Sequence, residues 1–305
     1  MRRHHLRATL LSLLGLTSAA SVSIGCGSAA TSAASSSASA AADPRPDDHG
    51  LRGPLLWEVQ GPRASSYLFG TLHLGFRADR DLPDWVWDKL RACDTFVMET
   101  NLSKVDVLEV TRLASLPDGQ SLADMLPTED WQELVQLTGL PESTLQSRQP
   151  WFASHLVFQQ LYPTPVPLDL ALMQRASEMN KEIAFLEDWK FQLQVLARTI
   201  TAKDLGELLG PDGDGRRLMA DLIAAYRAGD LERLAAIAEQ ERAEDPQRHD
   251  LLLAARNRDW VPKLRPHLDR GRTFVAVGAA HFPGGDGLIE LLRAEGYVLT
   301  RVVRP

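Results

Sequence analysis

Cysteine is scarce in this chain. The 305 residues include only Cys26 and Cys93, which excludes the disulfide-rich class of small exported domains. Cys93 lies where a helical pattern gives way to a strand pattern, so we expect it to be a small buried apolar residue. If Cys26 is lipidated, no disulfide can form within the chain.

Basic clusters and internal repeats are also missing. The formal net charge is −7, and no run of Lys and Arg occurs in the body of the chain. Nucleic-acid binding needs such clusters, so we expect no nucleic acid among the partners. No repeat of 20–50 residues is visible, and the length suits one large domain with a helical insertion.

The longest uncharged apolar stretch is at the N-terminus. Residues 1–7 are basic, and residues 8–25 are uncharged and rich in Leu, Ala and Ser, a pattern that predicts a signal peptide over residues 1–25. A membrane-spanning helix is the alternative, but the stretch is short and holds several Ser and Gly residues. The segment ends Ser23-Ile-Gly-Cys26, which resembles a bacterial lipobox with Ser23 in place of the usual Leu.

We therefore predict a lipoprotein whose acyl chains on Cys26 bind a membrane. Ordinary cleavage near Ala19 or Ala20, giving a soluble periplasmic product, is the alternative. Residues 26–50 are mostly Ala and Ser and predict a disordered tether, so the folded domain should span residues 51–305. Gly27 is not the usual retention residue for an inner membrane, which favours the periplasmic side of the outer membrane in a bacterial envelope.

The rest of the chain predicts an α/β (α+β) fold. Apolar, β-branched runs predict strands at residues 55–59, 66–70, 95–99, 182–186, 274–277 and 297–303. Long stretches of helical spacing lie between the third, fourth and fifth of these runs. The order predicts a central mixed β-sheet flanked by helices, with a large helical insertion covering the strand ends.

Polar residues follow four of the predicted strands. His73 and His281 each come three residues after a glycine, Gly70 and Gly278, at the end of a strand. Residues at such strand ends point into the crevice where α/β proteins bind ligands. A single histidine in this setting is more often structural, but two of them suggest two walls of one site.

Carboxylates end the other two strands. Glu99 ends the third and Glu187 the fourth. Imidazole and carboxylate ligands suit a divalent metal, so we predict that His73, His281 and Glu99 hold an ion that activates water. Gly70 and Gly278 would form the turns at this site and let a ligand approach closely. Glu187 would be a fourth ligand or the base that orders the water.

These motifs resemble those of the TraB/GumN family, which is related to the Tiki membrane metalloproteases and to erythromycin-esterase-like domains. The similarity extends from about residue 55 to residue 303. It rests on LFGTLHLG (68–75), VMET (97–100), PLDLAL (167–172), FLEDWKFQ (185–192), RNRDW (256–260) and FVAVGAAHFPGGDG (274–287). Asp188 stands where many members have Thr.

The resemblance implies a metal-dependent hydrolase, with both histidines and Glu99 as working residues and manganese or cobalt as the metal. Zinc is a further candidate, because imidazole and carboxylate ligands also suit that ion. We expect a membrane-tethered envelope enzyme that cleaves a peptide or a small molecule. The alternative is a binding protein that sequesters a peptide or haem without turnover, because the fold alone does not fix one activity.

Several residues outside this set have two interpretations. Arg256 and Asn257 are candidate catalytic residues that bind a substrate carboxylate or an oxyanion, or they cap a helix and pair with Asp259. For Asp169 the pattern favours a helix cap over a metal ligand, and Gln192 is expected to face the site.

Three other histidines are predicted to lie outside the site. His155 is expected to be a core histidine with its hydrogen bonds satisfied, because it lies on an apolar helix. His249 and His267 are expected to be solvated, because they lie in polar helical segments.

Overall fold

The structure is a computed structural model that describes residues 53–164, 166–209 and 214–303. The signal peptide, the lipobox with Cys26 and the tether over residues 26–50 lie outside these ranges, so their assignment stays a prediction. Among the helices that the structure describes, none combines the length and the apolar composition needed to cross a membrane.

Six strands form one mixed sheet in the order β4-β3-β5-β2-β1-β6. They are β1 (Leu56–Gln60), β2 (Ser65–Thr71), β3 (Thr95–Thr100), β4 (Glu182–Glu187), β5 (Thr273–Gly278) and β6 (Val298–Arg301). β1 and β2 form the predicted antiparallel hairpin, and β6 adds to β1 antiparallel. β2, β5, β3 and β4 run parallel. The predicted mixed sheet is confirmed.

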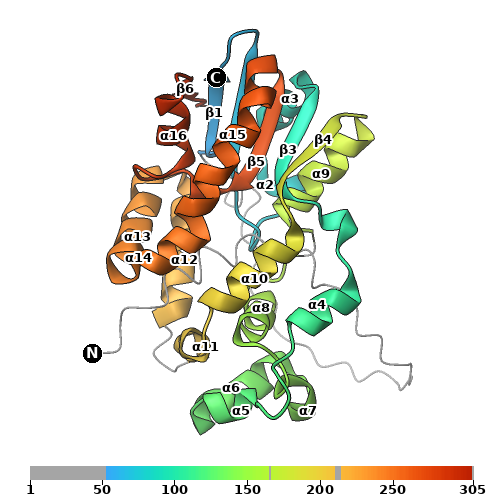
Figure 1. Ribbon diagram of the computed structural model, residues 1–305, viewed down its shortest axis with the longest axis vertical. Coiled ribbons are helices and arrows are strands. Elements are labelled where there is room, and N and C mark those ends of the chain that lie inside the picture. Colours follow the sequence, from blue (N-terminus) through green and yellow to red (C-terminus); the bar gives the residue numbers. More distant parts are fainter. Residues whose placement is uncertain (1–52, 165, 210–213, 304–305) are drawn as a thin grey trace, which may run out of the picture.

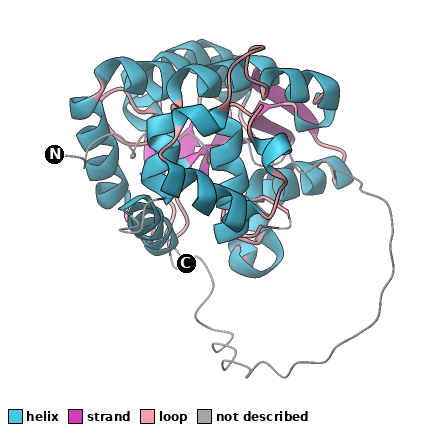
Figure 2. Cartoon of the chain, turned by 90° about the horizontal axis from the view of Figure 1, so that it is seen from below, coloured by secondary structure: helices cyan, strands magenta, loops and turns pink. Residues whose placement is uncertain are grey.

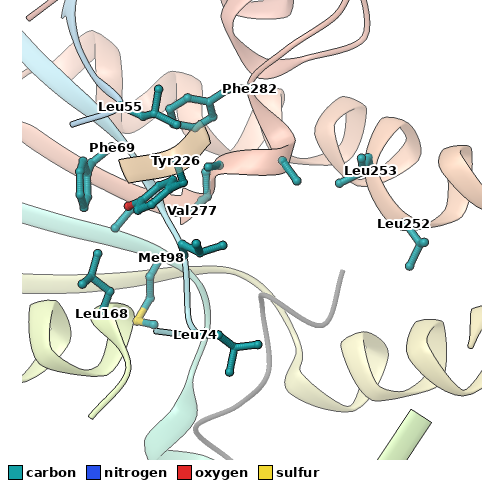
Figure 3. Packing of buried hydrophobic residues seen from close by; sticks show 14 of the residues in the cluster. Leu55, Phe69, Leu74, Met98, Leu168, Tyr226, Leu252, Leu253, Val277 and Phe282 are labelled. Atoms are coloured by element: carbon teal, nitrogen blue, oxygen red, sulfur yellow. The ribbon is translucent and has the colours of Figure 1, made fainter. Parts of the chain in front are cut away.

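The two central strands explain the apolar runs in the sequence. Every residue of β3 and of β5 is buried, as expected for parallel strands covered on both faces. The apolar side chains next to these strands come from distant parts of the chain. Figure 3 shows Leu168 beside Met98 of β3, and Tyr226 beside Val277 of β5.

Helices connect the strands in two long series. Before β4 they are α2 (Ala78–Asp81), α3 (Asp84–Ala92), α4 (Val107–Leu113), α5 (Leu122–Met125), α6 (Thr128–Thr138), α7 (Glu142–Leu145), α8 (Pro150–Leu161) and α9 (Leu168–Glu178). After β4 they are α10 (Trp189–Thr199), α11 (Ala202–Leu209), α12 (Asp214–Ala228), α13 (Leu231–Glu244), α14 (Pro246–His249), α15 (Ala255–Arg270) and α16 (Leu288–Ala294).

The helices divide into those that flank the sheet and those that cover its end. α9 packs on β3, β4 and β5, and α15 packs on β4 and β5. Helices α4 to α8, with α10 and α11, lie beyond the end of the sheet where β3 and β4 finish (Figure 1). From below, helices lie in front of the strands (Figure 2). The insertion at the strand ends is therefore confirmed, but two separate segments build it.

Candidate active site

The strands β2, β5, β3 and β4 end at one level. In the sheet register Thr71 pairs with Gly278, and Thr100 pairs with Glu187. The residues that follow β2 and β5, and the carboxylates that end β3 and β4, therefore emerge along the same edge. Four segments far apart in the sequence contribute to this edge.

His73 is buried and is held through one ring nitrogen. Its Nδ1 contacts Oδ2 of Asp169, and Oδ1 of Asp169 accepts a hydrogen bond of 2.6 Å from the Thr71 hydroxyl. The second nitrogen, Nε2, is buried without a hydrogen-bond partner. The predicted capping role of Asp169 is wrong, since α9 has no side-chain cap, and the carboxylate orients His73 instead.

His281 is oriented in a similar way. Its Nδ1 lies 2.6 Å from Oδ1 of Asn257, and the Asn257 side chain donates 2.8 Å to the carbonyl of Asp286. The ring of Trp260 lies 4.3 Å from the imidazole, measured between centroids. Asn257 therefore positions a predicted metal ligand, and neither interpretation from the sequence anticipated this contact.

Burial keeps both imidazoles uncharged. It lowers the pKa of His73 to about 3, and it lowers the pKa of His281 well below its ordinary value. Among the neighbouring groups, Arg256 contributes most to lowering the pKa of His281, ahead of His249 and His73. Burial also raises the pKa of Asp169 to about 8, and all three shifts oppose charge in the interior. Although the contact between His73 and Asp169 has the geometry of an ion pair, burial favours a pair without net charges.

Arg256 joins the two predicted carboxylates. Its Nη2 donates to Oε2 of Glu99 over 2.8 Å and to Oε1 of Glu187 over 2.6 Å, while its Nε donates to Oε2 of Glu187 over 3.1 Å. Trp260 Nε1 also donates to Glu187 over 3.1 Å. All four side chains in this network are held by one another, and Arg256 does not pair with Asp259 as one interpretation proposed.

A short π-helix precedes this arginine. Residues Asp250–Ala254 form the π-helix, and α15 continues from it. Arg256 Nη1 donates 2.9 Å to the carbonyl of Leu252 within the π-helix, which ties the guanidinium to its own helix. Such π segments recur at functional sites because they change the direction in which the following side chains point. Here those side chains are Arg256 and Asn257.

Glu99 lies at the centre of the polar contacts. Oε1 accepts 2.6 Å from the backbone N–H of Gly278, and Oε2 accepts 2.6 Å from Gln192 Nε2 as well as from Arg256. The expectation that Gln192 faces the site agrees with this contact. Burial raises the pKa of Glu99, and Arg256 opposes that shift.

The two glycines provide room rather than turns. Gly70 lies inside β2, and Gly278 has a φ of −53° that any residue adopts. A Cβ on Gly278 would lie 3.2 Å from Oε1 of Glu99 and 3.6 Å from Cδ2 of His281. Of the two predicted roles, the contacts at Gly278 agree with close approach rather than with a turn, because the carboxylate and the imidazole both lie over a position without a side chain.

We expect Gly70→Ala to lower the free energy of unfolding by about 1–3 kcal/mol, since it overfills a packed site. The new Cβ would lie 3.1 Å from the ring of Phe282 and 3.2 Å from the backbone of Ala279. Gly285→Ala is the matched control, because nothing lies within 4 Å of its Cβ position. Urea unfolding of both variants measures the effect, and equal stabilities would refute the close contact at Gly70.

One histidine does not lie where the sequence placed it, and another lacks the partner that was expected for it. His249 was predicted to be solvated, but it is buried and its Nε2 lies 3.2 Å from Oδ2 of Asp286. His155 is buried as expected, yet its Nε2 has no partner, so it is not a satisfied core histidine. His267 is half-buried beside Arg270.

The side chains at this edge suit a divalent cation by their chemistry. Each of His73 and His281 has Nδ1 fixed by an oxygen, the arrangement that orients Nε2 of metal-binding histidines. Two buried carboxyl groups, on Glu99 and Glu187, share one guanidinium, and a third, on Asp169, contacts His73. In the ranges that the structure describes, no three His, Cys, Asp or Glu side chains are already gathered closely enough to hold an ion.

Comparisons with known proteins follow the same motifs. A family model described as the TraB/PrgY/gumN family matches residues 55–301. The uncharacterized protein YbaP of Shigella flexneri is 28% identical over 247 residues, which cover 75% of this chain and 88% of YbaP. Metalloprotease TIKI2 of Danio rerio is 24% identical over 316 residues, covering 79% of this chain and 60% of TIKI2. No solved structure matches the chain.

Proposed function

Because the chain belongs to the TraB/PrgY/gumN family, we propose that it is a metal-dependent hydrolase that cleaves peptides. The similarity to a protein named as a metalloprotease supports hydrolysis. The observation that carries the proposal is the state of His73. Its Nδ1 is held by Asp169, and its Nε2 is buried without a partner, as expected of an imidazole whose remaining lone pair serves a ligand.

Three side chains would hold the ion. His73 and His281 would bind through Nε2, and Glu99 through Oε1, which accepts only the Gly278 N–H among the hydrogen bonds within the described ranges. Manganese or cobalt is the expectation from the resemblance, and the ligand types also suit zinc. A divalent ion held by these residues would lower the pKa of bound water, to about 7 in the best-known case, and would thereby supply hydroxide near neutral pH.

The other polar residues would position these three. Arg256 holds Glu99, and Glu187 holds Arg256 through two hydrogen bonds. Asn257 holds His281. For Glu187 these contacts support a positioning role rather than the predicted role of base, because its two oxygens together already accept three N–H groups.

The location of the enzyme is a further part of this proposal. The basic N-terminus, the apolar stretch over residues 8–25 and the lipobox-like Cys26 support export and lipid anchoring in a bacterial envelope. Membrane fractionation of Cys26→Ser beside the wild-type chain tests this, and a variant that stays in the membrane fraction would contradict it.

The proposed activity is tested with the purified full chain after its metal has been removed by a chelator. The substrate is a pool of acetylated, amidated hexapeptides of mixed sequence, incubated with manganese, cobalt or zinc. We expect cleavage only when a metal is added back. Retention of intact hexapeptides with no cleavage under any metal would instead support the sequestering protein.

A further inference from the structure

His249 is a buried histidine that has no part in the proposed chemistry. Its side chain is 7% exposed, and its Nε2 lies 3.2 Å from Oδ2 of Asp286. Because an ionised carboxylate can only accept, Nε2 carries the proton and donates. Among the described residues, Nδ1 has no hydrogen-bond partner, which costs free energy in the interior. The hydrogen bond to Asp286 is therefore the contact that distinguishes this imidazole from an apolar side chain of similar shape.

Asp286 is held at two points by one continuous helical segment. The segment runs through α14, the π-helix Asp250–Ala254 and α15 without a break. His249, the last residue of α14, contacts the carboxylate of Asp286, and Asn257 in α15 donates to its backbone carbonyl over 2.8 Å. The π-helix lies between these two residues, and such segments recur at functional sites. Both ends of Asp286 are thus fixed by the same segment.

The Asp286 carbonyl determines which way the Asn257 amide faces. Nδ2 of Asn257 donates to this carbonyl and, over 3.3 Å, to the backbone carbonyl of His281. Carbonyls can only accept, so they hold the NH2 group and turn Oδ1 toward Nδ1 of His281, which is 2.6 Å away. Oδ1 can only accept in its turn. Nδ1 of His281 therefore carries the proton, and Nε2 keeps its lone pair.

The loop that carries Asp286 has few contacts of its own. It connects His281 to α16 and reads Phe-Pro-Gly-Gly-Asp-Gly over residues 282–287. Gly284 has a φ of +89°, a conformation that favours glycine, and nothing lies within 4 Å of the Cβ position of Gly285. Asp286 has the only polar side chain in this loop, so its contact with the buried His249 supplies a fixed point that the glycines cannot.

We propose that His249 is a positioning residue of the candidate active site, which by fixing Asp286 keeps the lone pair of His281 on Nε2. The contacts form one chain from His249 through Asp286 and Asn257 to His281, and each link is 3.2 Å or shorter. This inference rests on the proposed function, in which Nε2 of His281 binds the ion. His249 itself contacts neither the ion nor the substrate.

The first measurement needs no metal. NMR of the isotopically labelled full chain in chelator distinguishes a protonated ring nitrogen from a bare one, and the signals lost in His281→Ala identify those of His281. We expect one tautomer in the wild-type chain, with Nδ1 protonated. His249→Phe keeps a ring but cannot donate, so it should give a mixture of tautomers. Asp286→Ala should do the same, although it keeps the carbonyl that Asn257 contacts.

The second measurement is manganese affinity, by calorimetric titration into the metal-free chain. His249→Phe and Asp286→Ala should each lose about tenfold, the lower end of the range for a residue next to a metal ligand, because His249 lies two contacts further away. The double variant should lose no more than either single one, since both break the same contact. His249→Gln should restore most of the affinity, because its amide can donate in place of Nε2.

Tyr297→Phe is the matched control. Its hydroxyl donates 2.5 Å to Oδ1 of Asp269, so this variant also loses one hydrogen bond to a carboxylate. Asp269 precedes β5 and Tyr297 precedes β6, and the two strands run in the same direction. The pair therefore lies at the end of the sheet opposite to His281, and the tautomer and the manganese affinity should stay as in the wild-type chain.

The results separate this inference from the proposed function. A single tautomer, or an unchanged manganese affinity, in both His249→Phe and Asp286→Ala would overturn the inference, as would additive losses in the double variant or equal losses in Tyr297→Phe. A wild-type chain that binds no metal would contradict the proposed function, and the tautomers alone would then decide the role of His249. If His249→Phe does not fold, the partly exposed Asp286→Ala decides by the same measurements.

Discussion

His73→Ala should lose more than about 100-fold in manganese affinity, since even changes next to a metal ligand cost 10–100-fold. The variant removes the Nε2 atom that is buried without a partner and leaves Asp169 without its imidazole. His281→Ala should show the same loss, because its imidazole is the second one that an oxygen orients. Calorimetric titration of manganese, cobalt and zinc into the metal-free protein measures both. Hydrolysis of the hexapeptide pool should vanish with the metal.

The size of the loss in metal affinity distinguishes a metal ligand from a residue that only positions one. Asn257→Leu keeps both imidazoles but removes the oxygen that fixes His281, so we expect an intermediate loss of about 10–100-fold. His267→Ala is the control, because that half-buried histidine lies on α15 with its Nδ1 3.1 Å from Nη2 of Arg270, which is not a site residue. Metal affinity that is unchanged in both His73→Ala and His281→Ala would end the metal assignment, whatever the peptide assays show.

Much of the sheet could be predicted because local sequence determines it. β3 and β5 are buried along their whole length, so their residues must be apolar and their runs stand out. The glycine, histidine and glutamate that follow such runs could then be assigned to one edge, because parallel strands present their ends together. The register of Thr71 with Gly278 agrees with this reasoning.

The partners of these residues could not be predicted, because they come from helices whose placement depends on the whole fold. Asp169 looked like a helix cap, since an acid near the start of a helix usually is one, and only the packing of α9 on the sheet brings it to His73. Arg256 and Asn257 depend on the π-helix before them, which no periodicity in the sequence revealed. His155 resembles a core histidine until its lack of a partner is seen.

The network around Arg256 has the largest expected effect on stability. Arg256→Met keeps most of the side-chain volume but leaves Glu99 and Glu187 buried without their cation. Breaking a buried ion pair in this way costs about 3–5 kcal/mol, because one charge remains uncompensated. Arg242→Met is the matched control. Its pair with Glu239 is exposed on α13, so its loss should cost less than about 1 kcal/mol.

The cost of Arg256→Met should depend on pH in a defined direction. Burial already raises the pKa of Glu99 above its ordinary 4.5, and Arg256 is the largest influence that lowers it. Without the guanidinium, the pKa of Glu99 in the folded state rises further above its value in the unfolded state. The variant therefore loses stability as the pH rises through the folded-state pKa of Glu99, and this loss is absent below the ordinary pKa of 4.5.

Urea unfolding in chelator at pH 8 and at pH 5 tests this directly. The difference between Arg256→Met and the wild-type chain should be largest at pH 8 and clearly smaller at pH 5. Adding Glu187→Gln to the variant should recover part of the loss at pH 8, because one of the two uncompensated carboxylates is then neutral. An equal cost at both pH values would mean that Arg256 stabilises the site by packing on Trp260, whose ring centroid lies 4.8 Å from the guanidinium carbon, rather than by its charge.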